Sequence, residues 1–339
     1  MNRRHFLMGL TGLAGCSRGK PRLNVFNWSD YIGPTTIPRF EFEHNCEVKY
    51  MVYESNEEML AKVFGGNSGW DVVFPSNYYV EPMAASDLLA PLDRSKLANL
   101  ANLEPWLQQP KWDPQVRWSV PYMTGAAGIA FDKRRQPTPT RWADLWDERY
   151  KGRITMLDDA AEVLGAALKM LGMPLNSSDP AQLDRAKVEL IKQKQLVRAY
   201  LNAEARDQLV AGDLLAIQTW ATTASQAIEA APHLDFVYPA EGFSIYSDCA
   251  VILRESTQQE LAHQFLDYLL RPRVAAAIVT HSKTASANRE ARKMLPPVLR
   301  DNAVLYPPQE VLDRGEWFTP VPPVAQRLRD RLWTEIKSG

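Results

Sequence analysis

Short apolar strand patterns alternate with helix patterns along this chain, and the alternation runs through it twice. In the first series, strands are predicted at residues 23–27, 47–53 and 70–74, with helices at 34–44 and 55–65 between them. Strands separated by helices of this length form βαβ units, in which consecutive strands lie parallel. The pattern therefore predicts an α/β fold.

The second series begins after a loop at 136–140 that is dense in Pro and Thr. Two extended segments, at 119–131 and 246–253, lie where the chain is expected to cross between the two series. At roughly 150 residues per domain, 339 residues leave room for two domains. We therefore expect two α/β lobes joined by two crossing strands. The second series has predicted helices at 142–146, 159–171, 179–195, 258–270, 273–280 and 324–337, and strands at 153–157, 214–219 and 234–238.

The first twenty residues have the pattern of an export signal. Arg3 and Arg4 precede an apolar run at 6–14, which is too short to cross a bilayer as a helix. The run ends in Leu-Ala-Gly-Cys, which resembles the lipobox of bacterial lipoproteins and predicts cleavage after residue 15 with lipidation of Cys16. Residues 16–22 would then be a lipidated linker. The arginine pair also resembles a twin-arginine signal, although Asn2 replaces the usual serine.

Composition excludes several function classes. The formal net charge is -1 and no basic run occurs, so nucleic acid is not an expected partner. The five histidines are scattered, without the close pairing of a metal site. No phosphate loop or catalytic triad pattern occurs, and no cofactor is expected. Cys46 and Cys249 are expected to be unpaired and buried, and Cys249 lies in an apolar stretch without a neighbouring basic group that would activate it.

Carboxylates and aromatic rings follow the predicted strands. In parallel sheets, ligands bind at the carboxyl ends of the strands, so these positions are candidates for a binding site. Ammonium groups carry hydrogen-bond donors and no acceptors, and therefore need carboxylates or carbonyls. Aromatic faces attract cations by about 0.5–2 kcal/mol each and also cover methylene groups. The pattern therefore favours a flexible organic polycation as ligand.

Four residues at these strand ends also have a purely structural interpretation. Asp159 and Glu162 have the spacing of a helix capping box. Trp28 could be a core aromatic, and Asp248 could be a turn residue at the start of a strand. The residues alone leave these alternatives open.

Six motifs carry a resemblance to a known family, the bacterial periplasmic spermidine/putrescine-binding proteins of polyamine ABC transporters. The resemblance covers the chain from about Leu23 to the end, and it rests on the order and spacing of the motifs. It implies a two-lobed periplasmic-binding-protein fold of type II, in which each lobe is a mixed, mainly parallel sheet flanked by helices. The first lobe would comprise 22–130 plus 249–292, and the second 131–248 plus 293–339. The motifs are Asn27-Trp28-Ser29-Asp30-Tyr31, Phe74-Pro75-Ser76-Asn77-Tyr78-Tyr79, Trp142-Ala143-Asp144-Leu145-Trp146, Tyr150-Lys151-Gly152, Leu269-Leu270-Arg271-Pro272 and Trp333-Thr334-Glu335-Ile336-Lys337-Ser338-Gly339.

The resemblance also implies roles for the strand-end residues. Asp30 would contact one terminal amine, Asp159 and Glu162 would hold the opposite amine, and Asp248 would face an amine within the chain. The aromatic residues would line the methylene spacers. The complete implied ligand-binding set is Trp28, Ser29, Asp30, Tyr31, Ser76, Tyr78, Asp159, Glu162, Trp220, Tyr246 and Asp248.

The implied function is an extracytoplasmic polyamine receptor that is not an enzyme. It would be a monomer in the periplasm or cell envelope, anchored to a membrane through Cys16, and it would deliver its ligand to the permease subunits of an ABC importer. The alternatives are a receptor for another cationic amine, a polyamine sensor without a transport role, and a thiaminase-like enzyme. Three departures from the family pattern leave the ligand length open: Thr284 stands where the family has a pocket tyrosine, Phe318 where spermidine binders have glutamine, and Thr223 where putrescine-selective members have aspartate.

Overall fold

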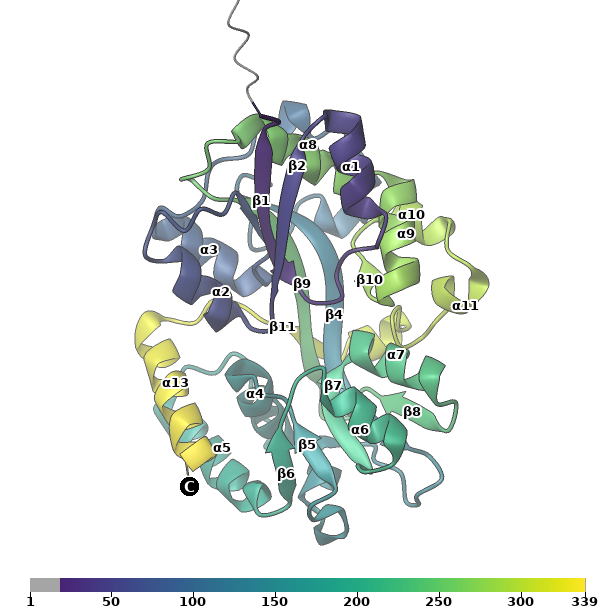
Figure 1. The fold of residues 1–339 in the computed structure, drawn as a ribbon. Coiled ribbons are helices and arrows are strands. Elements are labelled where there is room, and N and C mark those ends of the chain that lie inside the picture. Colours follow the sequence, from purple (N-terminus) through teal and green to yellow (C-terminus); the bar gives the residue numbers. More distant parts are fainter. Residues whose placement is uncertain (1–18, 339) are drawn as a thin grey trace, which may run out of the picture.

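Two α/β lobes lie one above the other in the computed structural model, which describes residues 19–338 (Figure 1). They are joined by β4 (Ser119–Asp132) and β9 (Phe243–Ile252), two long strands that run from one lobe into the other. Cys16 and the predicted signal sequence lie outside the described residues. Within 19–338, none of the helices combines the length and the hydropathy that crossing a bilayer requires.

The first lobe is built on a parallel trio of strands. Its central strand pairs in parallel with a neighbour on each side, as the alternating pattern predicted. The third strand then pairs antiparallel with β9, which ties the trio to the crossing strands. The strands are β1 (Arg22–Trp28), β2 (Glu47–Tyr53) and β3 (Val72–Val73), and the helices are α1 (Thr36–His44), α2 (Asn56–Val63), α3 (Asn77–Ala85), α8 (Gln259–Leu269), α9 (Pro272–Ser282), α10 (Arg289–Lys293) and α11 (Pro297–Arg300).

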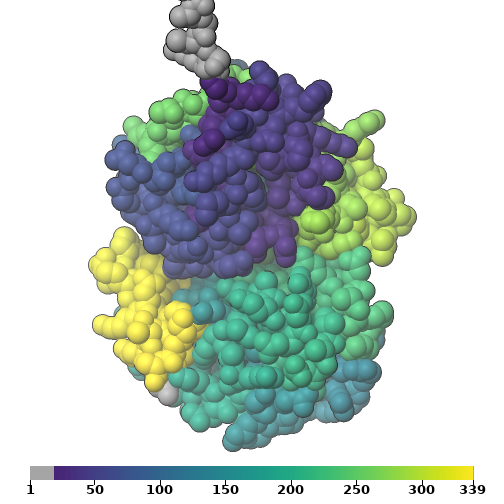
Figure 2. Space-filling model, viewed as in Figure 1, coloured from purple at the N-terminus to yellow at the C-terminus, as the bar shows by residue number. Residues whose placement is uncertain are grey.

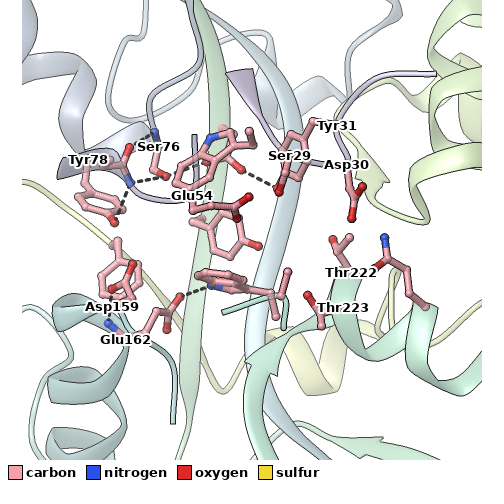
Figure 3. Close-up of a pocket in the computed structure, with 18 residues that line it drawn as sticks. Ser29, Asp30, Tyr31, Glu54, Ser76, Tyr78, Asp159, Glu162, Thr222 and Thr223 are labelled. Atoms are coloured by element: carbon pink, nitrogen blue, oxygen red, sulfur yellow. Dashed lines mark hydrogen bonds between the residues drawn. The ribbon is translucent and has the colours of Figure 1, made fainter. Parts of the chain in front are cut away.

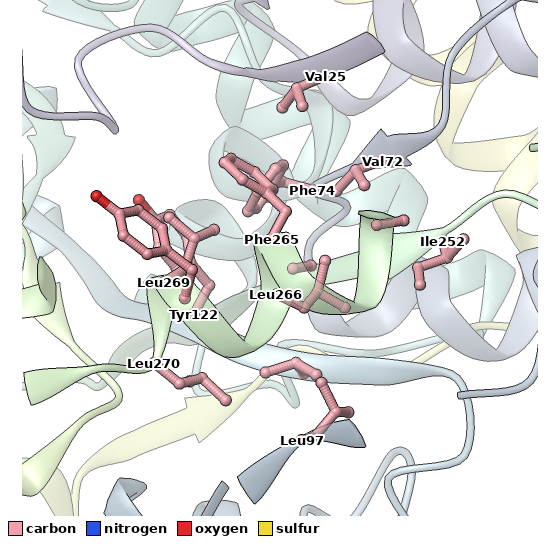
Figure 4. Close-up of a cluster of buried hydrophobic side chains, with 14 of the residues drawn as sticks. Val25, Val72, Phe74, Leu97, Tyr122, Ile252, Phe265, Leu266, Leu269 and Leu270 are labelled. Carbon is pink, nitrogen blue, oxygen red and sulfur yellow. The ribbon is translucent and has the colours of Figure 1, made fainter. Parts of the chain in front are cut away.

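Helix α8 shows how this lobe forms its core. Its apolar residues recur three and four positions apart, so they form one face of the helix. Phe265, Leu266 and Leu269 of that face are buried against the sheet residues Val72 and Ile252 (Figure 4). Packing of this kind holds β3 and β9 in fixed positions, and with them the pocket residues that follow β3 or lie within β9.

The second lobe repeats the plan with a second parallel trio. Its central strand, β5, pairs in parallel with β6 and β7, and β7 then pairs antiparallel with β4. The C-terminal helix α13 packs on α4 and α5. The strands are β5 (Ile154–Met156), β6 (Val197–Tyr200), β7 (Ala216–Trp220) and β8 (Leu234–Val237), and the helices are α4 (Ala160–Met170), α5 (Pro180–Lys194), α6 (Ala205–Ala211), α7 (Ala221–Ala230) and α13 (Pro323–Ser338).

The crossing strands form an antiparallel ribbon between the lobes. Their register runs from Ser119 opposite Val251 to Ala126 opposite Ile245. The strand order through the molecule is β2-β1-β3-β9-β4-β7-β5-β6, so each parallel trio continues into this ribbon. Two short strands and a helix complete the fold: β10 (Ala285–Ser286) pairs with β4, β11 (Gly315–Trp317) pairs with β9, and α12 (Gln309–Leu312) precedes β11. The architecture confirms the predicted fold class, a two-lobed α/β protein with mixed sheets and crossing strands.

Local details differ from the sequence predictions. Asn77–Ala85 forms helix α3, which is not among the predicted helices. The expected helix at 142–146 is a short 3-10 segment, and β9 begins at Phe243, three residues before the predicted crossing. Cys46 and Cys249 are both free and buried, as predicted.

Candidate functional site

A pocket lies between the two lobes, beside the crossing strands, and all eleven residues of the predicted site line it (Figure 3). The empty space among its side chains, including the part open to solvent, is about 700 Å³. The lining residues are Trp28, Ser29, Asp30, Tyr31, Glu54, Asn56, Ser76, Tyr78, Asp159, Glu162, Ala203, Trp220, Thr222, Thr223, Gln226, Tyr246, Asp248 and Phe318.

The pocket collects strand ends and helix starts from both lobes. From the first lobe come the residues at the end of β1 and the start of α3, and from the second come the start of α4 and the end of β7. Tyr246 and Asp248 lie within β9 itself, so the crossing ribbon forms the back wall. The residues predicted from the carboxyl ends of the strands therefore lie around one pocket.

Asp248 is buried in the back wall, with 2% of its surface exposed. Tyr31 Oη donates a hydrogen bond to one carboxylate oxygen at 2.8 Å, and Ser76 Oγ donates to the other at 2.7 Å. Asn56 positions Ser76 in turn, since its Oδ1 accepts from Ser76 N and its Nδ2 donates to Ser76 Oγ, both at 3.1 Å. Burial raises the pKa of Asp248 to about 7, despite the two hydrogen bonds, which lower it.

Asp159 and Glu162 lie at the N-terminus of α4 and have different roles. Asp159 Oδ1 accepts from Glu162 N at 2.9 Å, which is the N-cap bond of the helix. Glu162 does not complete a capping box. Its two oxygens instead accept from Trp220 Nε1 at 3.1 Å and from Ser244 Oγ at 2.6 Å, which fixes the carboxylate at the pocket.

Both carboxylates at this end have raised pKa values. Burial is the largest cause for each of them. The charge of Glu57 raises the pKa of Asp159 further, and the charge of Asp159 raises the pKa of Glu162. Two acidic groups in a buried site with no cation beside them hold their protons more tightly. A cation placed between them would lower both pKa values.

Aromatic rings supply the apolar walls. Trp28 is anchored by its indole nitrogen, which donates to the carbonyl oxygen of Phe74 at 2.8 Å. Tyr246 packs directly over Gly125 of β4, where an added Cβ atom would lie 2.4 Å from the tyrosine ring. The glycine therefore permits the close approach of this ring to the ribbon.

The three family departures are located as follows. Phe318 and Thr223 line the pocket. Thr284 does not, although the resemblance aligned it with a pocket tyrosine. Thr284 lies just before β10 and its side chain is fully buried. Its hydroxyl has no hydrogen-bond partner among the described residues. The side chain therefore lies inside the first lobe and does not reach the pocket.

The sequence prediction missed several lining residues. Glu54 directly follows β2, so the strand-end rule would have found it had it been applied to that strand. Asn56, Thr222 and Gln226 lie on α2 and α7. The sequence pattern did not predict α7, so it gave no reason to place Gln226 near the pocket.

The lobes contact each other across the pocket, and Figure 2 shows them meeting along one face. Asn202 Nδ2 donates to the backbone oxygen of Glu54 at 3.4 Å, and Gln226 Nε2 donates to that of Ser282 at 2.8 Å. In the part of the chain that is described, no group of three or more His, Cys, Asp and Glu side chains is arranged to hold a metal ion. The site is thus a partly closed pocket with carboxylates and aromatic walls.

Comparisons with known proteins agree on one kind of relative. Residues 68–314 match the family described as bacterial extracellular solute-binding protein, and residues 3–105 match a hypothetical lipoprotein family (MG045 family). The spermidine/putrescine-binding periplasmic protein of Escherichia coli is 33% identical over 94% of this chain and 92% of its own length. The putrescine/cadaverine-binding protein of Pseudomonas aeruginosa is 31% identical over 98% of both. A solved structure, a putative spermidine/putrescine ABC transporter from Listeria monocytogenes, superposes with a TM-score of 0.90 at 30% identity, covering 93% of this chain and 98% of that one.

Proposed function

Because the chain belongs to the spermidine/putrescine-binding group of the bacterial extracellular solute-binding proteins, we propose that it captures a polyamine between its lobes and delivers it to an ABC importer. In this proposal the first lobe comprises 22–130 plus 249–292, and the second comprises 131–248 plus 293–339, apart from α11, whose Leu299 packs with α9 of the first lobe. The ligand contacts are the eleven residues named from the sequence.

One observation carries the proposal: three carboxylates on the pocket lining are desolvated without a cationic partner. The pKa values of Asp248, Asp159 and Glu162 are all raised, and within the described residues no Lys, Arg or His is among the main causes of these shifts. An unpaired charge in a buried site costs several kcal/mol. Ammonium groups, with pKa values near 10.4, would supply the missing partners at neutral pH.

The same arrangement weighs against other functions. Anionic ligands would meet three acidic groups and no buried cation. An enzyme with a cysteine nucleophile would need a thiolate, and burial raises the pKa of the Cys249 thiol far above its usual range. A receptor for another cationic amine, or a sensor that reports polyamine to a partner, uses the same site, and ligand and transport assays separate these alternatives.

A thermal-shift screen of the mature protein tests the proposal. The ligands are putrescine, cadaverine, spermidine, spermine, agmatine and a set of amino acids. A ligand present at 100 times its Kd stabilises the folded state by about 2.7 kcal/mol, and isothermal titration then gives the affinity. Absence of binding by every amine at about 100 μM would remove the polyamine assignment and leave only the fold.

Membrane attachment is a separate part of the proposal. The short apolar run and the Leu-Ala-Gly-Cys sequence favour cleavage before Cys16 and lipidation of its thiol, and the match to a lipoprotein family over 3–105 supports this. Two or more acyl chains give stable anchoring. Mass spectrometry of protein isolated from its native membrane should give a lipidated N-terminal cysteine, whereas an unmodified chain retaining residues 1–15 contradicts the idea. Replacing Arg3 and Arg4 with lysine tests the twin-arginine route, because export that continues unchanged excludes it.

A further inference from the structure

We propose that Arg206 takes the place of one ligand ammonium group in this pocket, and that it thereby makes the site selective for a diamine over a triamine. The inference rests on the proposed polyamine function and names the ligand length that the site accepts. It starts from an arginine that is not itself part of the pocket lining but contacts two lining residues, Asp30 and Gln226.

Arg206 lies on α6 of the second lobe and reaches Asp30 of the first lobe. Its Nη1 is 3.9 Å from Asp30 Oδ2, so the pair bridges the lobes at one end of the pocket. The guanidinium is held by other groups as well: Nη1 donates to Gln226 Oε1 at 2.7 Å, and Nε donates to Asp207 Oδ1 at 2.9 Å. Gln226 itself lines the pocket and is fixed by its bond to the backbone oxygen of Ser282.

These bonds keep the positive charge at the rim whether or not Asp30 is engaged by a ligand. The Arg206 side chain is 30% exposed, so its charge is only partly screened by water. Charges near a protein surface interact more strongly than they do in bulk water. A ligand ammonium approaching Asp30 therefore meets a carboxylate that is 56% exposed and already has a cationic partner.

The remaining carboxylates form two separate positions for ammonium groups. Figure 3 shows Asp30 at the opposite end of the pocket from Asp159 and Glu162. Asp159 and Glu162 share one end, and Asp248 lies in the back wall with its own hydrogen bonds to Tyr31 and Ser76. Each desolvated ammonium needs at least one unpaired carboxylate, so the two positions accommodate two ammonium groups.

Glu54, the fifth carboxylate on the lining, does not add a third buried position. Its side chain is exposed, so solvent and salt screen its charge more than those of the buried carboxylates, although partial burial raises its pKa. A third ammonium would therefore have to compete with Arg206 for Asp30. Under these conditions the four-carbon diamine putrescine fits the available charges, and the triamine spermidine does not.

Isothermal titration with putrescine and spermidine tests the inference on three proteins. The wild type should bind putrescine at least 10-fold more tightly than spermidine. Arg206→Gln removes the charge and should lower this preference at least fivefold, mainly through tighter spermidine binding. Arg206→Lys keeps a charge at the rim and should retain the preference within about twofold.

Two further variants serve as controls. Arg198→Gln removes the same charge from an exposed position on β6 outside the pocket, and it should leave both affinities unchanged. Thermal unfolding establishes that each variant is folded, and Arg206→Met replaces Arg206→Gln if the latter is destabilised. A wild type that prefers spermidine, or a charge-removing variant with an unchanged preference, overturns the role of Arg206. Failure of both amines to bind the wild type instead overturns the proposed function.

Discussion

Asp248 combines deep burial, two neutral hydrogen-bond donors and no cationic partner in the described chain. Tyr31 and Ser76 stabilise its charged form, but burial outweighs them and raises its pKa to about 7. A structural carboxylate is usually satisfied by backbone donors, as Asp113 is by the backbone nitrogens of Arg117 and Trp118. The contrast favours a ligand ammonium as the partner of Asp248.

Replacing Asp248 with asparagine should therefore weaken polyamine binding by about 30-fold or more. The change keeps the shape of the side chain and removes the charge, and breaking a desolvated, hydrogen-bonded charge pair typically costs about 2–5 kcal/mol, where 1.4 kcal/mol is tenfold. Isothermal titration measures the effect. Asp235→Asn, which removes an exposed charge on β8, is the matched control and should bind normally. Normal binding by Asp248→Asn would show that the ligand lies elsewhere.

The raised carboxylate pKa values predict opposite pH trends for the free and the liganded protein. A group whose pKa is raised on folding stabilises the fold at pH values below its unfolded pKa of about 4, and this contribution is lost as pH rises through the folded value, about 7 for Asp248. The free protein should therefore lose the stability contributed by Asp248, Asp159 and Glu162 between pH 4 and pH 8.

Ligand binding should show the reverse trend, because the ammonium groups need ionised carboxylates and stay charged themselves. For each carboxylate with a pKa of about 7 that must ionise, the ionised fraction, and with it the affinity, should fall about fivefold between pH 7 and pH 6. Thermal unfolding with and without saturating amine should thus give a larger ligand-induced rise in Tm at pH 8 than at pH 6. An equal or larger rise at pH 6 would mean that these carboxylates do not face the ligand.

At the scale of single elements, the N-terminus of helix α4 supplies both the N-cap residue of the helix and two of the carboxylates that line the pocket. Asp159 is the N-cap, with its carboxylate bonded to the backbone of Glu162, while the Glu162 side chain turns to Trp220 and Ser244. Capping and ligand binding can be separated, because asparagine caps a helix as well as aspartate does and carries no charge.

Asp159→Asn should retain the unfolding free energy within about 0.5 kcal/mol, while polyamine affinity falls at least tenfold. Asp159→Ala should lose the affinity and also about 1 kcal/mol of stability, because the cap bond is gone. Denaturant unfolding and titration of both variants make the test. If asparagine preserves affinity as well as stability, Asp159 is only a cap.

For the whole molecule, the inter-lobe contacts indicate a closed arrangement. Asn77 Nδ2 donates to the backbone oxygen of Phe318 at 2.9 Å, and Lys283 pairs with Glu229 at 2.9 Å on another edge. The crossing strands are the connections able to absorb a hinge motion. Small-angle scattering should therefore give a smaller radius of gyration with saturating ligand than without it.

Replacing Gln226 with alanine removes its bond to Ser282 and should shift the free protein further toward the open form. The free variant should then have a radius of gyration at least as large as the free wild type, and both should compact with ligand. Identical dimensions with and without ligand for the wild type would indicate a lobe arrangement that does not change on binding.

The sequence by itself determined the α/β class and the two crossing strands, and its family resemblance implied the eleven residues that line the pocket. These features depend on local patterns: strand and helix periodicity is set by residues a few positions apart, and polar residues immediately after strands mark one edge of a parallel sheet.

Only the tertiary structure decided which side chains act together. Asp248 meets Tyr31 from 217 positions away and Ser76 from 172 positions away, and these bonds depend on how the crossing strands bring two lobes together. For the same reason, the sequence did not reveal that Arg206 reaches Asp30, that Gln226 bridges the lobes, or that Thr284 stops short of the pocket. Packing between distant segments determines such contacts, and no local sequence pattern predicts them.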